Sequence, residues 1–410
     1  MSIELTRRDE ALLAGSEGPG VALAMRVLAR TAEAMGARHF LDIVSAHVDG
    51  CLFHGQAGLD FARALVEGGA AVVVPTTLNV SSLDLLHPDL VRVDPGRAAD
   101  AAALMEAYTD LGCHPTWTCA PYQLPSRPAF GDQIAWAESN AIVFANSVLG
   151  ARTERYGDFL DICAAVTGRA PAVGLHMDEG RRATLVVSVE PVADLCDEDA
   201  FYPLLGHVLG QMAGSEVAAI VGLPPDTDED RLKAIGAGAA STGSVGMFHA
   251  VGITPEAPDL VTATAGETSR QVLVNREDLD RAVAELSTIA GGRVDAVSLG
   301  TPHYSASQLR VVASILGDRR LAVPLYVSTA RHVLDEVPDV VEMLAEAGVT
   351  VVTDTCTYVT PILDPTAKVV MTDSAKWAYY APANIGVDVV FGSLQACVEA
   401  ATTGRASMRW

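Results

Sequence analysis

Basic residues are scarce in this sequence. Lys and Arg number 28 against 51 Asp and Glu, which gives a formal net charge of −23 over 410 residues. A surface this acidic repels phosphate backbones and anionic lipid, so we expect neither nucleic acid nor a membrane surface as a partner. An anionic substrate would need a local pocket of Arg or Lys side chains.

Long apolar runs are also missing. No run approaches the ~20 residues that a transmembrane helix requires. The N-terminal MSIELTRRDEALLAG carries acidic residues and has no long apolar core, which is unlike a secretory signal, and we expect a cytoplasmic protein. The 7 cysteines include no C-x-x-C pair, which argues against a disulfide framework. Most of these thiols should be buried small side chains, and one or two could bind metal.

The pattern of apolar runs predicts the fold class. Half of the residues are apolar, which suits sheets covered on both faces. In the last third, short β-branched runs alternate with helical stretches, a pattern typical of a doubly wound parallel sheet. We therefore predict an α/β fold with sub-domains at residues 1–130, 131–285 and 286–410. The β-branched runs cover residues 294–302, 321–329, 348–356, 367–374 and 387–393.

Two further segments carry local predictions. AAVVVP at residues 70–75 reads as a strand. The Gly-rich stretch at 235–249 could be mistaken for a dinucleotide-binding loop. Its glycines do not match G-x-G-x-x-G and it follows a helix-like piece, so we expect an ordered functional loop instead.

Polar side chains follow several of the predicted strands, where ligands gather in parallel sheets. GTPHYS supplies His303 as an acid–base candidate and Ser305 as a further catalytic candidate; alternatively this is a helix N-terminal turn with Ser305 or Ser307 as the cap. DTC supplies Cys356, which could hold iron or could simply be a packed thiol. SAK supplies Ser374 as a further substrate-binding candidate and Lys376 as a catalytic one. This Lys could bind a carboxylate, act as a base if desolvation lowers its pKa, or be an ordinary exposed residue of a first helical turn.

The segment WAESNAIVFANSVLGARTERYG at 136–157 interleaves hydrogen-bonding groups with apolar residues. Each such group costs free energy if it is buried without a partner, so we expect them to line a polar pocket. Two N-terminal strand ends are comparable, although turn chemistry alone could explain them. The candidate substrate-binding residues from these regions are His47, Thr77, Asn79, Ser139, Asn140, Asn146, Ser147, Arg152 and Thr153.

Taken together, these motifs resemble those of the aconitase X family, in its large or catalytic subunit. They occur in order over nearly the whole chain, which makes a chance match implausible. The matching pieces are AHVDGC at 46–51, VPTTLN at 74–79, TCAPYQ at 118–123, the 136–157 segment, FHAVGITPEAP at 248–258, GTPHYS at 300–305, TDTCTYVTPI at 353–362 and TDSAKWAYY at 372–380.

The resemblance implies an aconitase-like architecture and a hydro-lyase. Members of that family dehydrate cis-3-hydroxy-L-proline in bacteria or mevalonate 5-phosphate in archaea, using an iron–sulfur cluster held by distant cysteines. Cys119 and Cys356 occupy two of the ligand positions, but the third, a cysteine in the family, is Thr301 here. This departure leaves open a smaller cluster such as [2Fe–2S], a single metal ion, or no metal.

The resemblance also implies a small swivel domain, and nothing in residues 1–410 reads as one. We therefore expect a separate small partner subunit. The preferred substrate is the small anionic hydroxy acid cis-3-hydroxy-L-proline, because no P-loop or Arg/Lys cluster points to a phosphate. In this hypothesis Lys376 and Arg152 neutralise the substrate carboxylate, while Asn146, Ser147 and Thr77 orient it. The alternatives are a dehydratase or isomerase for another hydroxy acid, such as mevalonate 5-phosphate, and a non-catalytic binding subunit.

Overall fold

The chain folds into two compact units. The computed structural model describes residues 3–407 and 410. Contacts define an N-terminal unit of residues 1–83 and 93–182, and a C-terminal unit of residues 84–92 and 183–410. The short segment 84–92, which we call the strap, thus leaves the N-terminal unit and packs within the C-terminal one. The division falls after Arg182, whereas the sequence suggested limits near residues 130 and 285.

The N-terminal unit is built on a parallel sheet in the order β3-β2-β4. Apolar residues at helical spacing bury one face of α2, which starts at Pro19 and ends before Gly36, a residue in the left-handed conformation. Strands β1 and β5 pair antiparallel beside it. The elements are α1 (Arg7–Ala14), α2 (Pro19–Met35), β1 (Phe40–Asp42), β2 (Ser45–Val48), α3 (Gln56–Glu67), β3 (Thr76–Leu78), α4 (Pro95–Asp110), β4 (Ile134–Trp136), α5 (Ser139–Phe144), α6 (Leu160–Thr167) and β5 (Arg169–Pro171).

The first half of the C-terminal unit contains a second parallel sheet, in the order β8-β7-β6-β9. Its helices α7 and α8 pack against each other along their length. The elements are β6 (Leu185–Ser188), α7 (Phe201–Ala213), β7 (Ala218–Val221), α8 (Glu229–Thr242), β8 (Phe248–Ala250), α9 (Leu260–Thr264), β9 (Arg270–Leu273) and α10 (Arg276–Leu286).

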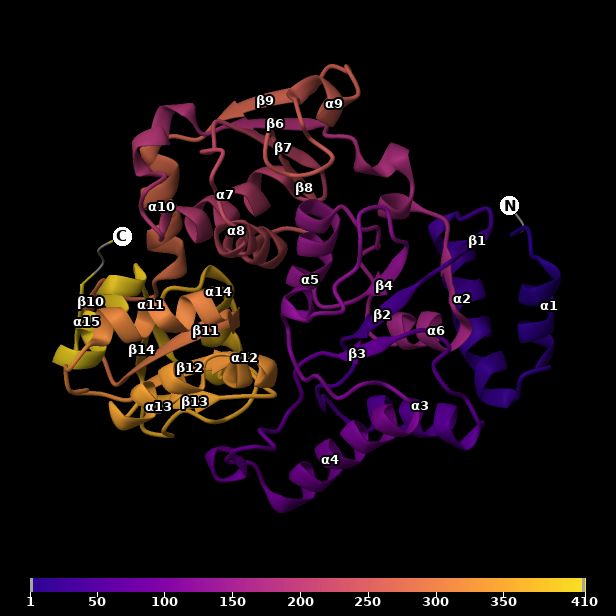
Figure 1. Cartoon of the computed structure of the whole chain (residues 1–410), viewed down its shortest axis with the longest axis horizontal. Coiled ribbons are helices and arrows are strands. Elements are labelled where there is room, and N and C mark those ends of the chain that lie inside the picture. The colour runs from indigo at the N-terminus through magenta and orange to yellow at the C-terminus, as the bar shows by residue number, and fades with distance from the viewer. Residues whose placement is uncertain (1–2, 408–409) are drawn as a thin grey trace. The chain divides into compact units, whose positions relative to one another are not determined.

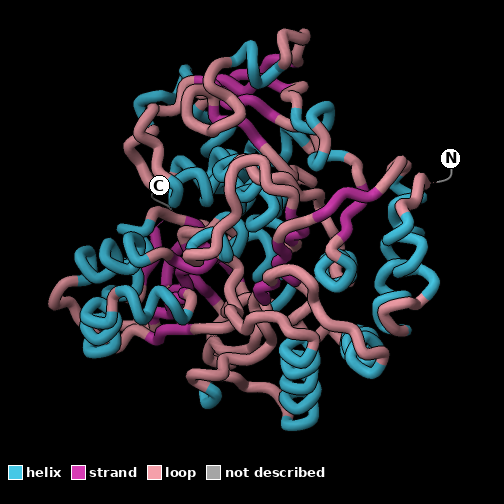
Figure 2. The backbone as a smooth tube through the Cα atoms, turned by 45° about the vertical axis from the view of Figure 1, so that its right-hand side comes forward, coloured by secondary structure: helices cyan, strands magenta, loops and turns pink. Residues whose placement is uncertain are grey.

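The second half of the C-terminal unit confirms the predicted doubly wound sheet. Its strands run parallel in the order β13-β12-β11-β14-β15, and helices cover both faces (Figures 1 and 2). A short antiparallel pair, β10 with β16, lies beside it. The elements are β10 (Gly291–Arg293), β11 (Ala296–Tyr304), α11 (Ala306–Leu316), β12 (Leu325–Thr329), α12 (Arg331–Glu336), α13 (Pro338–Glu346), β13 (Thr350–Val352), β14 (Val369–Thr372), α14 (Ala375–Ile385), β15 (Asp388–Phe391), α15 (Leu394–Thr403) and β16 (Arg405–Ser407).

Two local predictions were wrong. Residues 70–75 form no strand, and the chain pairs only at β3, just beyond them. The Gly-rich stretch begins inside α8 rather than forming a loop. Its glycines serve helix packing, because a Cβ on Gly238 would lie 2.8 Å from the backbone nitrogen of His207 in α7.

No helix among the described residues is long and apolar enough to cross a membrane. The cytoplasmic location expected from the sequence stays a prediction.

Candidate metal centre

The candidate site of the C-terminal unit begins with His303 in β11. The sequence predicted this residue just past the end of the strand. In the structure β11 extends to Tyr304 and includes it. The ring is fully buried, and Nε2 lies 3.1 Å from the backbone oxygen of Thr355. Since a carbonyl oxygen only accepts, Nε2 must carry the proton and Nδ1 is the basic nitrogen. Histidines that bind metal commonly have this arrangement, with the second ring nitrogen donating to a backbone carbonyl.

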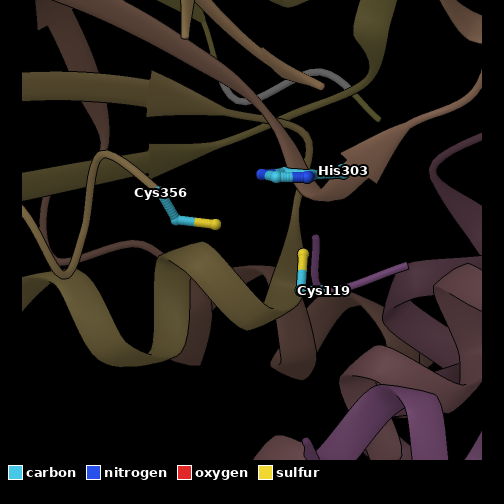
Figure 3. A group of neighbouring side chains, drawn as sticks. All are labelled: Cys119, His303 and Cys356. Atoms are coloured by element: carbon cyan, nitrogen blue, oxygen red, sulfur yellow. The ribbon is translucent and has the colours of Figure 1, made fainter. Parts of the chain in front are cut away.

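Cys356 lies beside this ring. It follows β13 in a loop, is buried, and its sulfur comes within 4.8 Å of a ring nitrogen of His303. Figure 3 shows these two side chains of the C-terminal unit. A thiolate and an imidazole are ligands typical of zinc sites and of some iron–sulfur centres. The donor chemistry of the pair therefore fits a metal ion or a small cluster.

Thr301 occupies the position where the family resemblance implies a third cysteine. Its hydroxyl oxygen is buried and has no hydrogen-bond partner within the part of the chain that the structure describes. A neutral hydroxyl is a much weaker ligand for iron than a thiolate. The groups of this unit that could bind a metal here are thus one thiol and one imidazole.

Two serines of the predicted site cap helices. Ser305 accepts a bond from the Gln308 backbone nitrogen at 3.2 Å and donates to a carboxylate oxygen of Asp230 at 2.7 Å. Ser374 accepts from the Trp377 nitrogen at 3.0 Å and donates to the Thr301 backbone oxygen. The capping alternative for Ser305 is therefore confirmed. Roles in catalysis for Ser305 and in substrate binding for Ser374 stay predictions.

Lys376 follows Ser374 in the first turn of α14, where the sequence left open an exposed side chain. It is only 5% exposed, so that alternative is wrong. Burying an ammonium group is expensive unless it is compensated by opposite charge or strong hydrogen bonds. Lys376 thus has the burial expected of a functional cation, and its role stays a prediction.

A separate cavity of about 170 Å³ lies on the C-terminal unit. Tyr304 and Asp373 line it, and the tyrosine hydroxyl donates to the Asp373 carboxylate. Burial raises the pKa of that carboxyl to about 6. Neither residue was assigned a role from the sequence, although Asp373 directly precedes the Ser374 cap.

In the N-terminal unit the structure pairs two of the predicted residues. His47 in β2 and Thr77 in β3 lie on adjacent parallel strands, with 2.8 Å between Nδ1 and Oγ1. Burial lowers the pKa of His47 to about 3, so the ring is neutral at neutral pH. Asn79 donates to the carboxylate of Asp49. Burial raises the pKa of Asp49 well above its ordinary value.

Most polar side chains of the 136–157 segment have hydrogen-bond partners within the N-terminal unit. Asn146 exchanges hydrogen bonds with the backbone of Thr153 at 2.9 and 3.0 Å and accepts another from Arg181. Asn140 donates to the Tyr122 hydroxyl at 2.6 Å. Most of these polar groups therefore find partners in the fold itself, although the Asn140 side-chain oxygen has none among the described residues. A substrate-binding role for them stays a prediction.

The remaining candidates in that segment lie on the same unit. Arg152 forms an ion pair with Asp178 at 2.6 Å. Ser139 lies 3.4 Å from the carboxylate of Glu138, and Ser147 is buried. Their predicted contacts with substrate stay predictions.

Sequence reasoning missed two features. His303 was considered only as an acid or base, because its approach to Cys356 depends on strand order and not on sequence spacing. Asp161, whose pKa burial raises to about 7, accepts a bond from the Asp49 backbone nitrogen at 2.7 Å. An isolated Asp inside a helical stretch gives no signal of burial.

Fold and site together define a class: an α/β protein with a candidate metal centre built from the chain segments β11 and the β13–β14 loop. Family models match the chain as the aconitase X first domain over residues 2–179, the second domain over 183–284 and the third domain over 294–403. The chain belongs to the aconitase X family.

Relatives agree with that assignment. The chain is 46% identical to a cis-3-hydroxy-L-proline dehydratase of Pseudomonas aeruginosa, over 97% of this chain and 70% of the relative. It is 33% identical to the phosphomevalonate dehydratase large subunit of Methanosarcina mazei, over 98% of each chain. The crystal structure of Thermococcus kodakaraensis aconitase X in its holo-form matches with a TM-score of 0.87 and 31% identity, over 97% of this chain and 100% of that one. The predicted aconitase-like fold is confirmed. Dehydratases, as both relatives are named, are hydro-lyases.

Proposed function

We propose that this chain is the large subunit of a hydro-lyase that converts cis-3-hydroxy-L-proline to a pyrroline carboxylate. The observation that carries the proposal is the His303–Cys356 pair. The chain that contains it belongs to a family whose named relatives are dehydratases. Identity of 46% to a hydroxyproline enzyme, against 33% to a phosphomevalonate enzyme, favours the first substrate.

We propose that His303 and Cys356 hold an iron–sulfur cluster or a single metal ion, with Cys119 of the N-terminal unit as the further ligand. Cys119 is buried, and the resemblance implied a ligand at its position. When bound, the metal would act as a Lewis acid on the substrate hydroxyl. The expectation of a smaller cluster or single ion follows from Thr301.

The chain's own residues supply binding and charge. A base removes the proton alpha to the carboxylate, and the β-hydroxyl leaves as water. The enamine product then tautomerises to a cyclic imine. We propose that Lys376 and Arg152 neutralise the carboxylate, which also stabilises the negative charge that develops at the alpha carbon. Thr77, Asn146 and Ser147 would orient the substrate.

We also propose a small partner subunit that carries the swivel domain. The support is that a relative matching this chain over 98% of both lengths is named a large subunit. The partner would complete the site around the substrate.

The test is anaerobic purification with iron and sulfide analysis, together with a visible spectrum. Cys356→Ala and Cys119→Ala should lose the metal, while Cys397→Ala should retain it, because that equally buried thiol lies in α15. Full iron content in Cys356→Ala would refute the ligand assignment.

The second arm assays the chain together with the small subunit. Dehydration of cis-3-hydroxy-L-proline, and none of mevalonate 5-phosphate, is the expected result. The reverse preference would replace the proposed substrate. No turnover of either, in a metal-loaded complex, would favour the non-catalytic alternative.

A further inference from the structure

The strap places a buried carboxylate against the loop that carries Cys356. Asp84 is buried and accepts hydrogen bonds from both sides of this contact. Within the strap, the backbone nitrogens of Leu86 and His87 donate to Oδ1 at 3.0 and 2.8 Å, and the His87 ring lies 3.1 Å from Oδ2. From the loop, Thr353 donates its backbone nitrogen to Oδ2 and its hydroxyl to Oδ1, each at 2.9 Å.

The next loop residue is held by a second carboxylate pair. Asp354 is fully buried and receives two hydrogen bonds of 2.6 Å from the guanidinium of Arg331. The strap adds a third, from the Leu85 backbone nitrogen at 3.0 Å. Asp354 has a φ of +61°, a left-handed conformation that non-glycine residues adopt only when their surroundings impose it. These bonds are the surroundings that impose it.

The strap also holds the far end of the loop. The Arg92 backbone nitrogen donates to the Pro361 oxygen at 2.9 Å. Its guanidinium donates to the carbonyl oxygens of Ile362, at 3.0 Å, and Leu363. Both ends of the loop are therefore fixed by one short segment that is remote in sequence.

Between these ends lies the Cys356 thiol, with neither helix nor strand in the described residues from 353 to 363 to hold it. The loop bonds internally, with the hydroxyls of Thr355 and Thr360 2.6 Å apart. The Thr355 carbonyl is also the group that fixes the His303 ring. One loop conformation thus sets both the thiol direction and the imidazole tautomer.

We propose that the strap is the positioning element of the metal centre: Asp84, with the Arg331–Asp354 pair, holds the loop so that Cys356 faces His303 before metal arrives. The inference that this positioning favours metal binding rests on the proposed function. The positioning itself does not, because it concerns the direction and accessibility of a thiol in the metal-free protein. Asp84 and Asp354 are positioning residues, since Asp84 binds the loop, Asp354 anchors it from within, and neither touches the reacting atoms.

Thiol alkylation in the metal-free full-length chain tests the positioning. Asp84→Asn puts an amide NH2 against hydrogen-bond donors in either orientation, so it should raise the alkylation rate of Cys356 by at least about tenfold. The buried thiol of Cys397 should stay protected. Thr353→Val, which removes one donor to Asp84, should give a smaller rise and serves if the first variant does not fold. The control is Asp9→Asn, which alters an equally buried carboxylate in the N-terminal unit and should leave Cys356 protected.

A folded Asp84→Asn protein with unchanged Cys356 protection would overturn the proposal. So would a parallel rise at Cys397, because that would indicate general loosening. Cobalt(II) titration supplies a spectroscopic signature that a purely structural role would not move. The thiolate-to-cobalt absorption band should require about 10- to 100-fold more metal in Asp84→Asn than in wild type or Asp9→Asn. A wild-type protein without that band would contradict the proposed function, yet the alkylation result would still decide the positioning.

Discussion

Thr301→Val should stabilise the metal-free protein. The Thr301 hydroxyl is buried, and no described residue bonds it. A buried hydroxyl without a partner costs about 1–3 kcal/mol, whereas a methyl group of nearly the same volume costs nothing comparable. Since part of that cost is relieved by local adjustment, we expect a gain of about 1 kcal/mol. In a chain of this size that corresponds to a rise of about 1–2 °C in Tm.

Thr329→Val is the matched control. Thr329 is equally buried in the neighbouring strand β12, but its hydroxyl donates to the Tyr304 backbone oxygen at 2.7 Å. Removing that donor deletes a buried hydrogen bond and should cost about 1 kcal/mol. Thermal and urea unfolding of the two variants should therefore shift in opposite directions. Equal destabilisation by both would refute the reasoning, because the Thr301 hydroxyl would then have a partner in the free protein.

Thr301→Cys extends the same prediction to the metal. It places a thiol at the position where the family resemblance implies one, at no expected loss of hydrogen bonding. The variant should bind more iron per chain than wild type and change the visible spectrum. Unchanged iron and spectrum would mean that residue 301 does not face the bound metal.

Three further predictions concern the fold. The pKa of Asp373 is about 6 in the folded protein and 3.8 in the unfolded chain, so between these pH values the folded protein stays protonated while the unfolded chain loses its proton. The free energy of unfolding of the wild type therefore falls as pH rises from about 4 to 6. Asp373→Asn should therefore be the more stable protein at pH 8, by up to about 3 kcal/mol, and equal to wild type near pH 3. In the wild type the buried Asp9 carboxylate lies 2.8 Å from the Arg169 guanidinium. Arg169→Met removes this partner and should lower the free energy of unfolding, measured in urea, by about 3–5 kcal/mol. Gly300→Ala should cost about 3 kcal/mol or more, seen as loss of soluble folded protein, because its φ is +85° and a Cβ would lie 2.1 Å from the Ser328 oxygen.

The sequence was most informative where secondary structure follows a local period. Short β-branched runs between helical stretches predicted the sheet of β11 to β15, because most residues of β11, β12, β14 and β15 are buried, on both faces of the sheet. The same reasoning failed at residues 70–75, where apolar residues pack without pairing. It failed again near Gly238, where glycine allows two helices to approach and does not make a loop. Composition alone does not distinguish these uses.

The site was predictable only in part. Motifs placed Cys356 and Lys376 after strands, and both follow strands in the structure. Nothing in the local sequence indicates that Asp84 contacts Thr353, since the two are brought together by the tertiary path of the chain. Contacts of this kind depend on which segments the folded chain brings to the same edge of a sheet. The pattern of apolar residues in the sequence does not contain this information.

Cys356 needs the hydrogen bonds from the strap because it lies in a loop, whereas His303 lies in a strand. His303 lies in the buried strand β11, directly before Tyr304, whose pairing with Thr329 of β12 holds the strand there. Cys356 lies in a loop, where neither a helix nor a sheet ladder restrains the backbone. A loop residue is as precisely placed as a strand residue only if side-chain bonds replace the missing ladder, and buried carboxylates that each accept several donors do this most strongly. Asp84 and Asp354 have that property. Variation at these two residues should therefore disturb the metal centre more than variation at the surface of the same loop.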